Sequence, residues 1–257
     1  MINLSDSIFD SPEGNIEIPE RTGIIEKVHI KSVLEELENP VDNISLGNFD
    51  YIGEFTAKKQ RTPDKELFRK VGAFFRPNYE RGLLIHSLIK KYDIKTYLEI
   101  GYGRGYSCFC AAMTMNDLGR GEVITIDPAL DEEQIQNLAN VFPKEWFSKI
   151  KFYKSTSDDF FKNENISFDM AYIDGDHRYN AVKNDWENVK SHKPKVVLFD
   201  DYHLPGKNQK DMEVSSLIDQ IDDPSKRMII MDRRIFLDDR SYTDEQIDYG
   251  QVLIVNK

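Results

Sequence analysis

Apolar positions along the chain change their spacing regularly from residue 78 to the C-terminus. Short apolar segments predict strands at 96–100, 122–126, 150–153, 168–173, 195–199, 227–235 and 251–255. Between and before them, apolar residues recur at helical spacing and predict helices at 78–92, 105–117, 131–141, 157–162, 178–191 and 208–221. The chain therefore alternates strand and helix over most of its length.

This alternation indicates an α/β fold with parallel strands and helices on both faces of the sheet. Segments 170–173 and 196–199 are apolar without alternation, which is typical of strands buried on both faces. The last two strands have no helix between them, so we expect an antiparallel pair joined by the polar stretch 238–249. We predict a doubly wound, mostly parallel, seven-stranded sheet with an antiparallel C-terminal strand. Ligands of such sheets bind beyond the carboxyl ends of the strands.

Residues 1–77 lack this regularity and are rich in polar residues and proline. Only one helix is indicated there, beginning at Thr62-Pro63-Asp64 and running to about residue 74. We predict an N-terminal extension over 1–77, acting as a lid or in oligomerisation, before a domain at 78–257. The loop 204–211 would complete the lid. Aromatic residues that would line it, unless they are core residues, are Phe74, Phe75 and Tyr79.

Composition narrows the class of protein. The formal net charge of −11 argues against a general nucleic-acid binder, and 40% hydrophobic residues allow a sizeable core. No apolar run is long enough to span a bilayer, and the N-terminus lacks the features of a secretory signal. The two cysteines, Cys108 and Cys110, would point to different sides of a helix, so we expect buried thiols in a cytoplasmic protein.

The first predicted strand is followed by a glycine-rich turn, Glu99-Ile-Gly101-Tyr-Gly103-Arg-Gly105-Tyr-Ser107. Glycines let the backbone approach a ligand closely, and the helix start adds free amide donors. A tight turn without a ligand would look the same. A dinucleotide fingerprint would need a sixth-position glycine where Tyr106 stands, and the lysine of a phosphate loop is missing.

The second predicted strand ends at Asp127, whose distance from the glycines suits a carboxylate that accepts hydrogen bonds from a ribose. The other interpretation is a turn-forming residue before Pro128. The glycine turn and Asp127 together indicate a ligand with a ribose more specifically than either feature does alone.

Carboxylates also follow the fourth and fifth predicted strands, as Asp174-Gly-Asp176-His177 and Asp200-Asp201. If these strands are neighbours, Asp174, Asp200 and Asp201 converge and repel one another. A divalent cation would relieve the repulsion, and oxygen ligands suit Mg²⁺ well and Ca²⁺ tolerably. Alternatively, these residues cap the next helix or bind loop amides.

The glycine turn followed by an acid closing the next strand resembles class I S-adenosylmethionine-dependent methyltransferases, and Gly-Tyr-Ser at 105–107 is similar to the catechol-type O-methyltransferases. The resemblance runs from residue 78 to the C-terminus and implies a Rossmann-like fold. It implies a binding site for S-adenosylmethionine formed by Glu99, Gly101, Tyr102, Gly103, Gly105, Ser107, Asp127, Ser157 and Asp158. The aromatic rings of Tyr102 or Tyr106 would face the sulfonium.

Asp-Gly-Asp-His with a later Asp-Asp-Tyr resembles metal-dependent small-molecule O-methyltransferases, including the macrocin-type sugar enzymes. This implies Asp174, Asp200 and Asp201 as metal ligands, although the catechol-type pattern has Asp-Asn rather than Asp-Asp. His177 stands where the catechol-type enzymes carry a lysine base, so it is the predicted base. His203 is a second candidate for base or substrate contact.

We therefore predict transfer of a methyl group from S-adenosylmethionine to a hydroxyl of a small-molecule acceptor, assisted by Mg²⁺ or another divalent cation. Two alternatives remain open: an NAD-type oxidoreductase, and a non-catalytic binding protein with the same fold.

Overall fold

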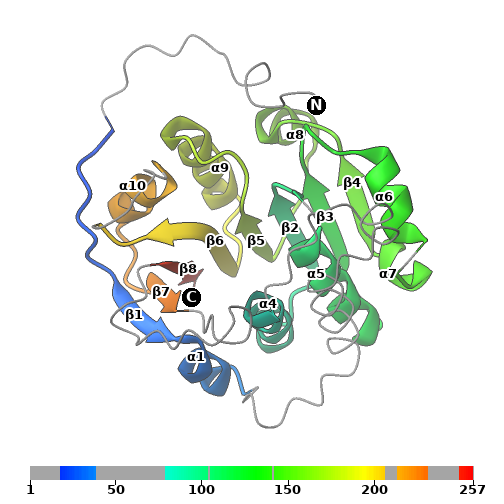
Figure 1. The fold of residues 1–257 in the computed structure, drawn as a ribbon, viewed down its shortest axis with the longest axis horizontal. Coiled ribbons are helices and arrows are strands. Elements are labelled where there is room, and N and C mark those ends of the chain that lie inside the picture. The colour runs from blue at the N-terminus through cyan, green and yellow to red at the C-terminus, as the bar shows by residue number, and fades with distance from the viewer. Residues whose placement is uncertain are drawn as a thin grey trace, which may run out of the picture.

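The computed structural model describes residues 18–38, 79–103, 105–140, 142–205, 213–230 and 249–256. They form one mixed sheet in the order β1-β7-β8-β6-β5-β2-β3-β4, with helices on both faces (Figure 1). The strands are β1 Glu26–His29, β2 Thr96–Ile100, β3 Glu122–Ile126, β4 Ile150–Tyr153, β5 Met170–Ile173, β6 Val196–His203, β7 Arg227–Ile230 and β8 Tyr249–Val255. The helices are α1 Ile30–Glu36, α4 Tyr79–Lys91, α5 Tyr106–Asp117, α6 Glu132–Ala139, α7 Lys144–Phe147, α8 Ser157–Asn163, α9 Tyr179–Ser191 and α10 Glu213–Gln220.

The predicted fold class is confirmed. Strand β2 lies between β3 and β5, and all three run parallel. Strand β8 is antiparallel to both β6 and β7, as expected for strands without a connecting helix. Because β2 and β5 are adjacent and β5 pairs with β6, the glycine turn and both acidic strand ends lie at one edge of the sheet.

The sheet has one strand more than predicted. Strand β1 pairs in parallel with β7, with Glu26 opposite Arg227, and α1 follows it directly. Part of the predicted N-terminal extension, β1, is therefore built into the same sheet as the strands of residues 78–257. The strand was missed because its four residues, Glu-Lys-Val-His, form too short and too polar a run to stand out.

Two apolar cores cover the two faces of the sheet. In β2, Tyr97 packs into the core that contains α1, α4 and α5, whereas Leu98 and Ile100 pack into the core that contains α9 and α10. This alternation follows from the two-residue period of a strand. It places Glu99 on the same face as Tyr97, under α4 and α5.

Other predictions can be placed on this structure only in part. The helix predicted at 62–74, the residues Phe74 and Phe75, and most of the loop 204–211 lie outside the described residues. Cys108 and Cys110 are buried and free, as predicted. Among the described helices, none combines the length and the apolar character needed to cross a lipid bilayer.

Candidate functional site

The turn after β2 can be built only with glycine at position 101. Gly101 has φ +92°, and an ideal Cβ there would lie 2.0 Å from the carbonyl oxygen of Asp174. The amide of Gly101 donates to Ile126 at 2.9 Å, which ties the turn to β3. Absence of a side chain thus lets the turn touch the end of β5, so the glycine turn and the acidic strand ends form one continuous site.

The rest of the turn packs against aromatic side chains. Gly105 precedes α5 with φ +82°, and an ideal Cβ there would lie 2.5 Å from the hydroxyl of Tyr102. Tyr102 packs edge-on against Phe152, and both Tyr102 and Tyr106 are buried in the core. This placement does not fit the expected contact of either ring with a sulfonium.

Asp127 holds the glycine turn in place. Its two carboxylate oxygens accept hydrogen bonds from the amide of Gly103 at 3.0 Å and from the amide of Ala129 at 2.7 Å. Asp127 is half-buried at the end of β3. It therefore forms the turn before Pro128 and at the same time stands beside the glycine turn.

Glu99 is a buried carboxyl next to this turn. It accepts a hydrogen bond from Thr125 Oγ1 at 3.1 Å. Burial raises its pKa to about 8, although the Thr125 hydrogen bond and the charge of Arg81 act in the opposite direction. Ser107, also buried, lies in the first turn of α5, where backbone amides are free to bind an anion.

Ser157 and Asp158, which were predicted to contact S-adenosylmethionine, make contacts with helix α9. The hydroxyl of Ser157 donates to Asp185, and the carboxylate of Asp158 accepts from the side-chain amide of Asn184. Thr156 caps α8 by accepting from the amide of Asp159. Burial raises the pKa of Asp185 to about 7. In this structure Ser157 and Asp158 therefore connect the start of α8 to α9 through side-chain hydrogen bonds.

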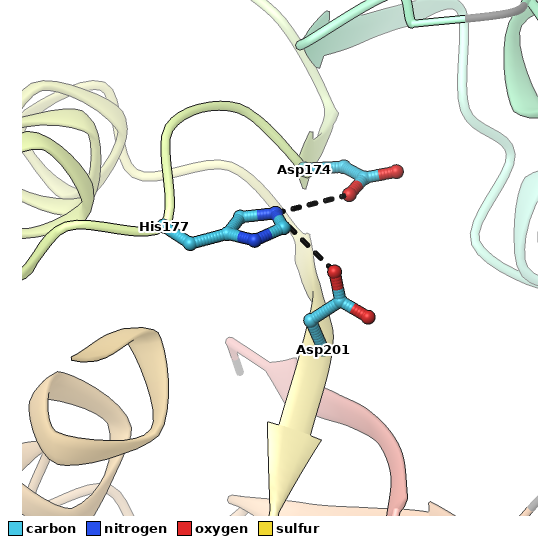
Figure 2. A group of neighbouring side chains, drawn as sticks. All are labelled: Asp174, His177 and Asp201. Atoms are coloured by element: carbon cyan, nitrogen blue, oxygen red, sulfur yellow. Dashed lines mark ion pairs between the residues drawn. The ribbon is translucent and has the colours of Figure 1, made fainter. Parts of the chain in front are cut away.

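Asp174, which follows β5, and Asp201, within β6, both face the Nε2 edge of the His177 ring (Figure 2). His177 Nε2 lies 3.2 Å from an oxygen of Asp201 and 4.0 Å from an oxygen of Asp174. One potential ligand atom from each residue lies within 4.8 Å of the others. The neighbouring Asp176 accepts from the amide of Arg178 at 3.0 Å and so closes a local turn, whereas α9 begins without the side-chain cap considered from the sequence.

Asp200, the third carboxylate, is buried. Its oxygens accept hydrogen bonds from Tyr172 at 2.9 Å and Tyr249 at 3.1 Å, and it forms an ion pair with Arg81. Burial alone would raise the pKa of Asp200, but Arg81 and these hydrogen bonds hold it below the usual value. Burial and repulsion by Asp200 raise the pKa of Asp174.

The sequence analysis missed Arg81. It lies one helical turn before Leu84 and Ile85, on the apolar face of α4 that continues to Leu88. A charged residue at this spacing on an otherwise buried face was the available signal. His203 lies farther along β6, where its ring is 4.9 Å from the ring of Tyr249.

Comparison with known proteins favours one of the enzyme classes left open. Residues 98–202 match the model of a family described as a methyltransferase domain. This part of the chain is therefore similar to a methyltransferase domain. This match spans the glycine turn, Asp127 and both acidic strand ends, and it supports the resemblance to class I S-adenosylmethionine-dependent methyltransferases.

Solved structures with this fold include two O-methyltransferases. TomG from Streptomyces achromogenes, which takes part in tomaymycin synthesis and was solved with S-adenosylmethionine, is 15% identical, with a TM-score of 0.52 over 83% of this chain and 100% of that chain. An O-methyltransferase from Bacillus cereus, solved with S-adenosylhomocysteine, is 14% identical, with a TM-score of 0.51 over 88% and 97%. At these identities the likeness shows the fold. Among curated proteins, no sequence match was found.

Proposed function

We propose that this methyltransferase domain transfers a methyl group from S-adenosylmethionine to a hydroxyl of a small-molecule acceptor. The observation that carries the proposal is the contact between Gly101 and the Asp174 carbonyl, which puts a turn suited to a nucleoside ligand beside a histidine base. Two O-methyltransferases of this fold were solved with the donor or its demethylated product, which supports the choice of ligand.

On the donor side, each group has a chemical task. Asp127 accepts hydrogen bonds from the ribose hydroxyls once they displace the amide of Gly103. The amides at the start of α5, near Ser107, bind the carboxylate of the methionine part. Glu99, whose burial favours the neutral form, becomes ionised when the ammonium group of the donor lies next to it.

On the acceptor side, His177 takes the proton from the hydroxyl. Its Nε2 faces oxygens of Asp201 and Asp174 at 3.2 Å and 4.0 Å, and these contacts orient the imidazole as a general base. The acceptor oxygen then attacks the methyl group in line with the departing sulfur, and the main contribution of the protein is alignment. The acidic surroundings favour a neutral or cationic acceptor.

A Mg²⁺ site made of Asp174, Asp200 and Asp201 does not fit this arrangement. Asp200 is 3% exposed, and its oxygens are already bound by Arg81, Tyr172 and Tyr249. A magnesium ion demands near-ideal octahedral geometry with oxygen ligands, and Asp200 would have to break these contacts to supply one. In the proposed reaction, His177 takes the proton without a metal ion held by these three carboxylates.

Calorimetry with S-adenosylhomocysteine tests the proposal. We expect the wild-type chain to bind it and Asp127→Ala to bind it about 10–100-fold more weakly, because hydrogen bonds from the ribose to a charged group are lost. Asp131→Ala is the matched control, since Asp131 also accepts backbone amides next to α6 and stands outside the glycine turn. No heat with this ligand, or binding of NADH instead, would refute the proposal.

A further inference from the structure

The acidic end of the sheet contains a positive charge that comes from helix α4. The Nη2 of Arg81 is paired with Oδ2 of Asp200, and its Nη1 lies 3.7 Å from Oδ2 of Asp174. The guanidinium carbon lies 5.8 Å from the centre of the Tyr172 ring. The guanidinium therefore faces two of the three carboxylates that the family likeness assigns to a metal ion.

Asp200 is held in a fixed orientation to receive this guanidinium. The hydroxyls of Tyr172 and Tyr249 donate to it, and the side-chain amide of Gln251 lies 3.4 Å away. All of these partners come from strands of the sheet. A buried carboxylate with this many donors loses several hydrogen bonds if it turns toward another ligand.

Asp174 connects this ion pair to the base. One of its oxygens faces Arg81, and the other lies 4.0 Å from Nε2 of His177. Any shift of the guanidinium therefore changes the orientation of a carboxylate that contacts the imidazole.

We propose that Arg81 is the resident cation of this site in place of a divalent metal ion, and that it is a positioning residue for His177 through Asp174. An arginine side chain stays charged throughout the working pH range and presents a planar fork that suits two carboxylates. It balances the repulsion that a metal ion would otherwise relieve. The positioning role rests on the proposed function, whereas the replacement of the metal ion does not.

Binding of Mn²⁺ by the full chain, followed by electron paramagnetic resonance, tests the replacement. We expect weak binding by the wild type and by Arg81→Lys, which keeps the charge. Arg81→Met should bind Mn²⁺ at least about tenfold more tightly, because a unit charge at this range changes a binding constant by more than that. Arg81→Met combined with Asp200→Asn is the matched control and should return to weak binding.

The same variants test the positioning role through kinetics. Methyl transfer by the wild type should be unchanged by a chelator. Arg81→Met should lower kcat with KM and S-adenosylhomocysteine affinity nearly unchanged, and Arg81→Lys should recover part of kcat. If Arg81 had a purely structural role, its replacement would instead change kcat, KM and the affinity for S-adenosylhomocysteine together.

Two results would overturn the proposal: wild-type protein that binds Mn²⁺ as tightly as Arg81→Met does, or wild-type activity that a chelator removes and Mg²⁺ restores.

If Arg81→Met does not fold, a comparison of Mn²⁺ binding by the wild type and by Asp174→Asn tests whether Arg81 replaces the metal ion. We expect both to be equally weak, and a clear loss in Asp174→Asn would show that a metal site exists. Failure to bind S-adenosylhomocysteine would refute the proposed function and leave the Mn²⁺ result valid.

Discussion

The two halves of the site are constructed in different ways. Around β2 and β3 the surface is backbone, shaped by Gly101 and Gly103 at positive φ and by the amides that Asp127 holds. At the ends of β5 and β6 it is a set of charged side chains whose positions depend on one another. A backbone surface tolerates few substitutions but needs no compensating charge, whereas a cluster of buried charges fails when one member is removed.

The largest effect should come from the charged half. We expect His177→Gln to lower kcat by about 10²–10⁴-fold, because the acceptor hydroxyl loses its base. Affinity for S-adenosylhomocysteine, measured by calorimetry, should stay within about twofold, since the backbone half is untouched. His203→Gln is the control and should retain activity. Equal losses in the two variants would contradict the assignment of the base.

Gly101→Ala tests the half of the site that is formed by the backbone. The new methyl group would meet the carbonyl of Asp174 at 2.0 Å in a conformation that alanine disfavours, so we expect a loss of about 3–4 kcal/mol of unfolding free energy. Gly103→Ala is the matched control, because Gly103 also has positive φ but has open space where its Cβ would lie. Its cost should be about 1–2 kcal/mol. Urea denaturation measures both values, and equal costs would show that the close approach to Asp174 does not matter.

The smallest effect concerns Asp185, which lies where the two halves meet. It accepts a hydrogen bond from Ser157 of the donor side, and its Oδ2 lies 3.5 Å from the position of an ideal Cβ on Gly175. Because burial raises its pKa from 3.8 to about 7, the folded state binds a proton more tightly than the unfolded state. This contribution to stability is complete below pH 4 and is lost as the pH rises through about 7.

Asp185→Asn should remove that pH dependence. Between pH 4 and pH 7, the free energy of unfolding of the wild type should fall relative to the variant by roughly 2–4 kcal/mol. Denaturation at several pH values gives both curves. Parallel curves would mean that Asp185 is ionised in the folded protein.

The glycine turn was predictable because its signal is local. Gly101, Gly103 and Gly105 stand within one turn, and a strand before them and a helix after them are visible in the apolar pattern. The position of Asp127 at the end of the next strand could be predicted for the same reason. Strand β1 and the Asp200–Arg81 pair could not, since each depends on a partner more than a hundred residues away.

The sequence by itself determined the α/β class, the strand ends where the candidate site lies and the types of group found there. Periodicity and short motifs depend on residues that are neighbours along the chain, and the sequence gives these neighbours directly. The tertiary structure alone decided which carboxylates face one another and that Arg81, from a helix before the motifs, pairs with Asp200. Electrostatic energy depends on distances through space, and these distances exist only after the sheet has placed its strands.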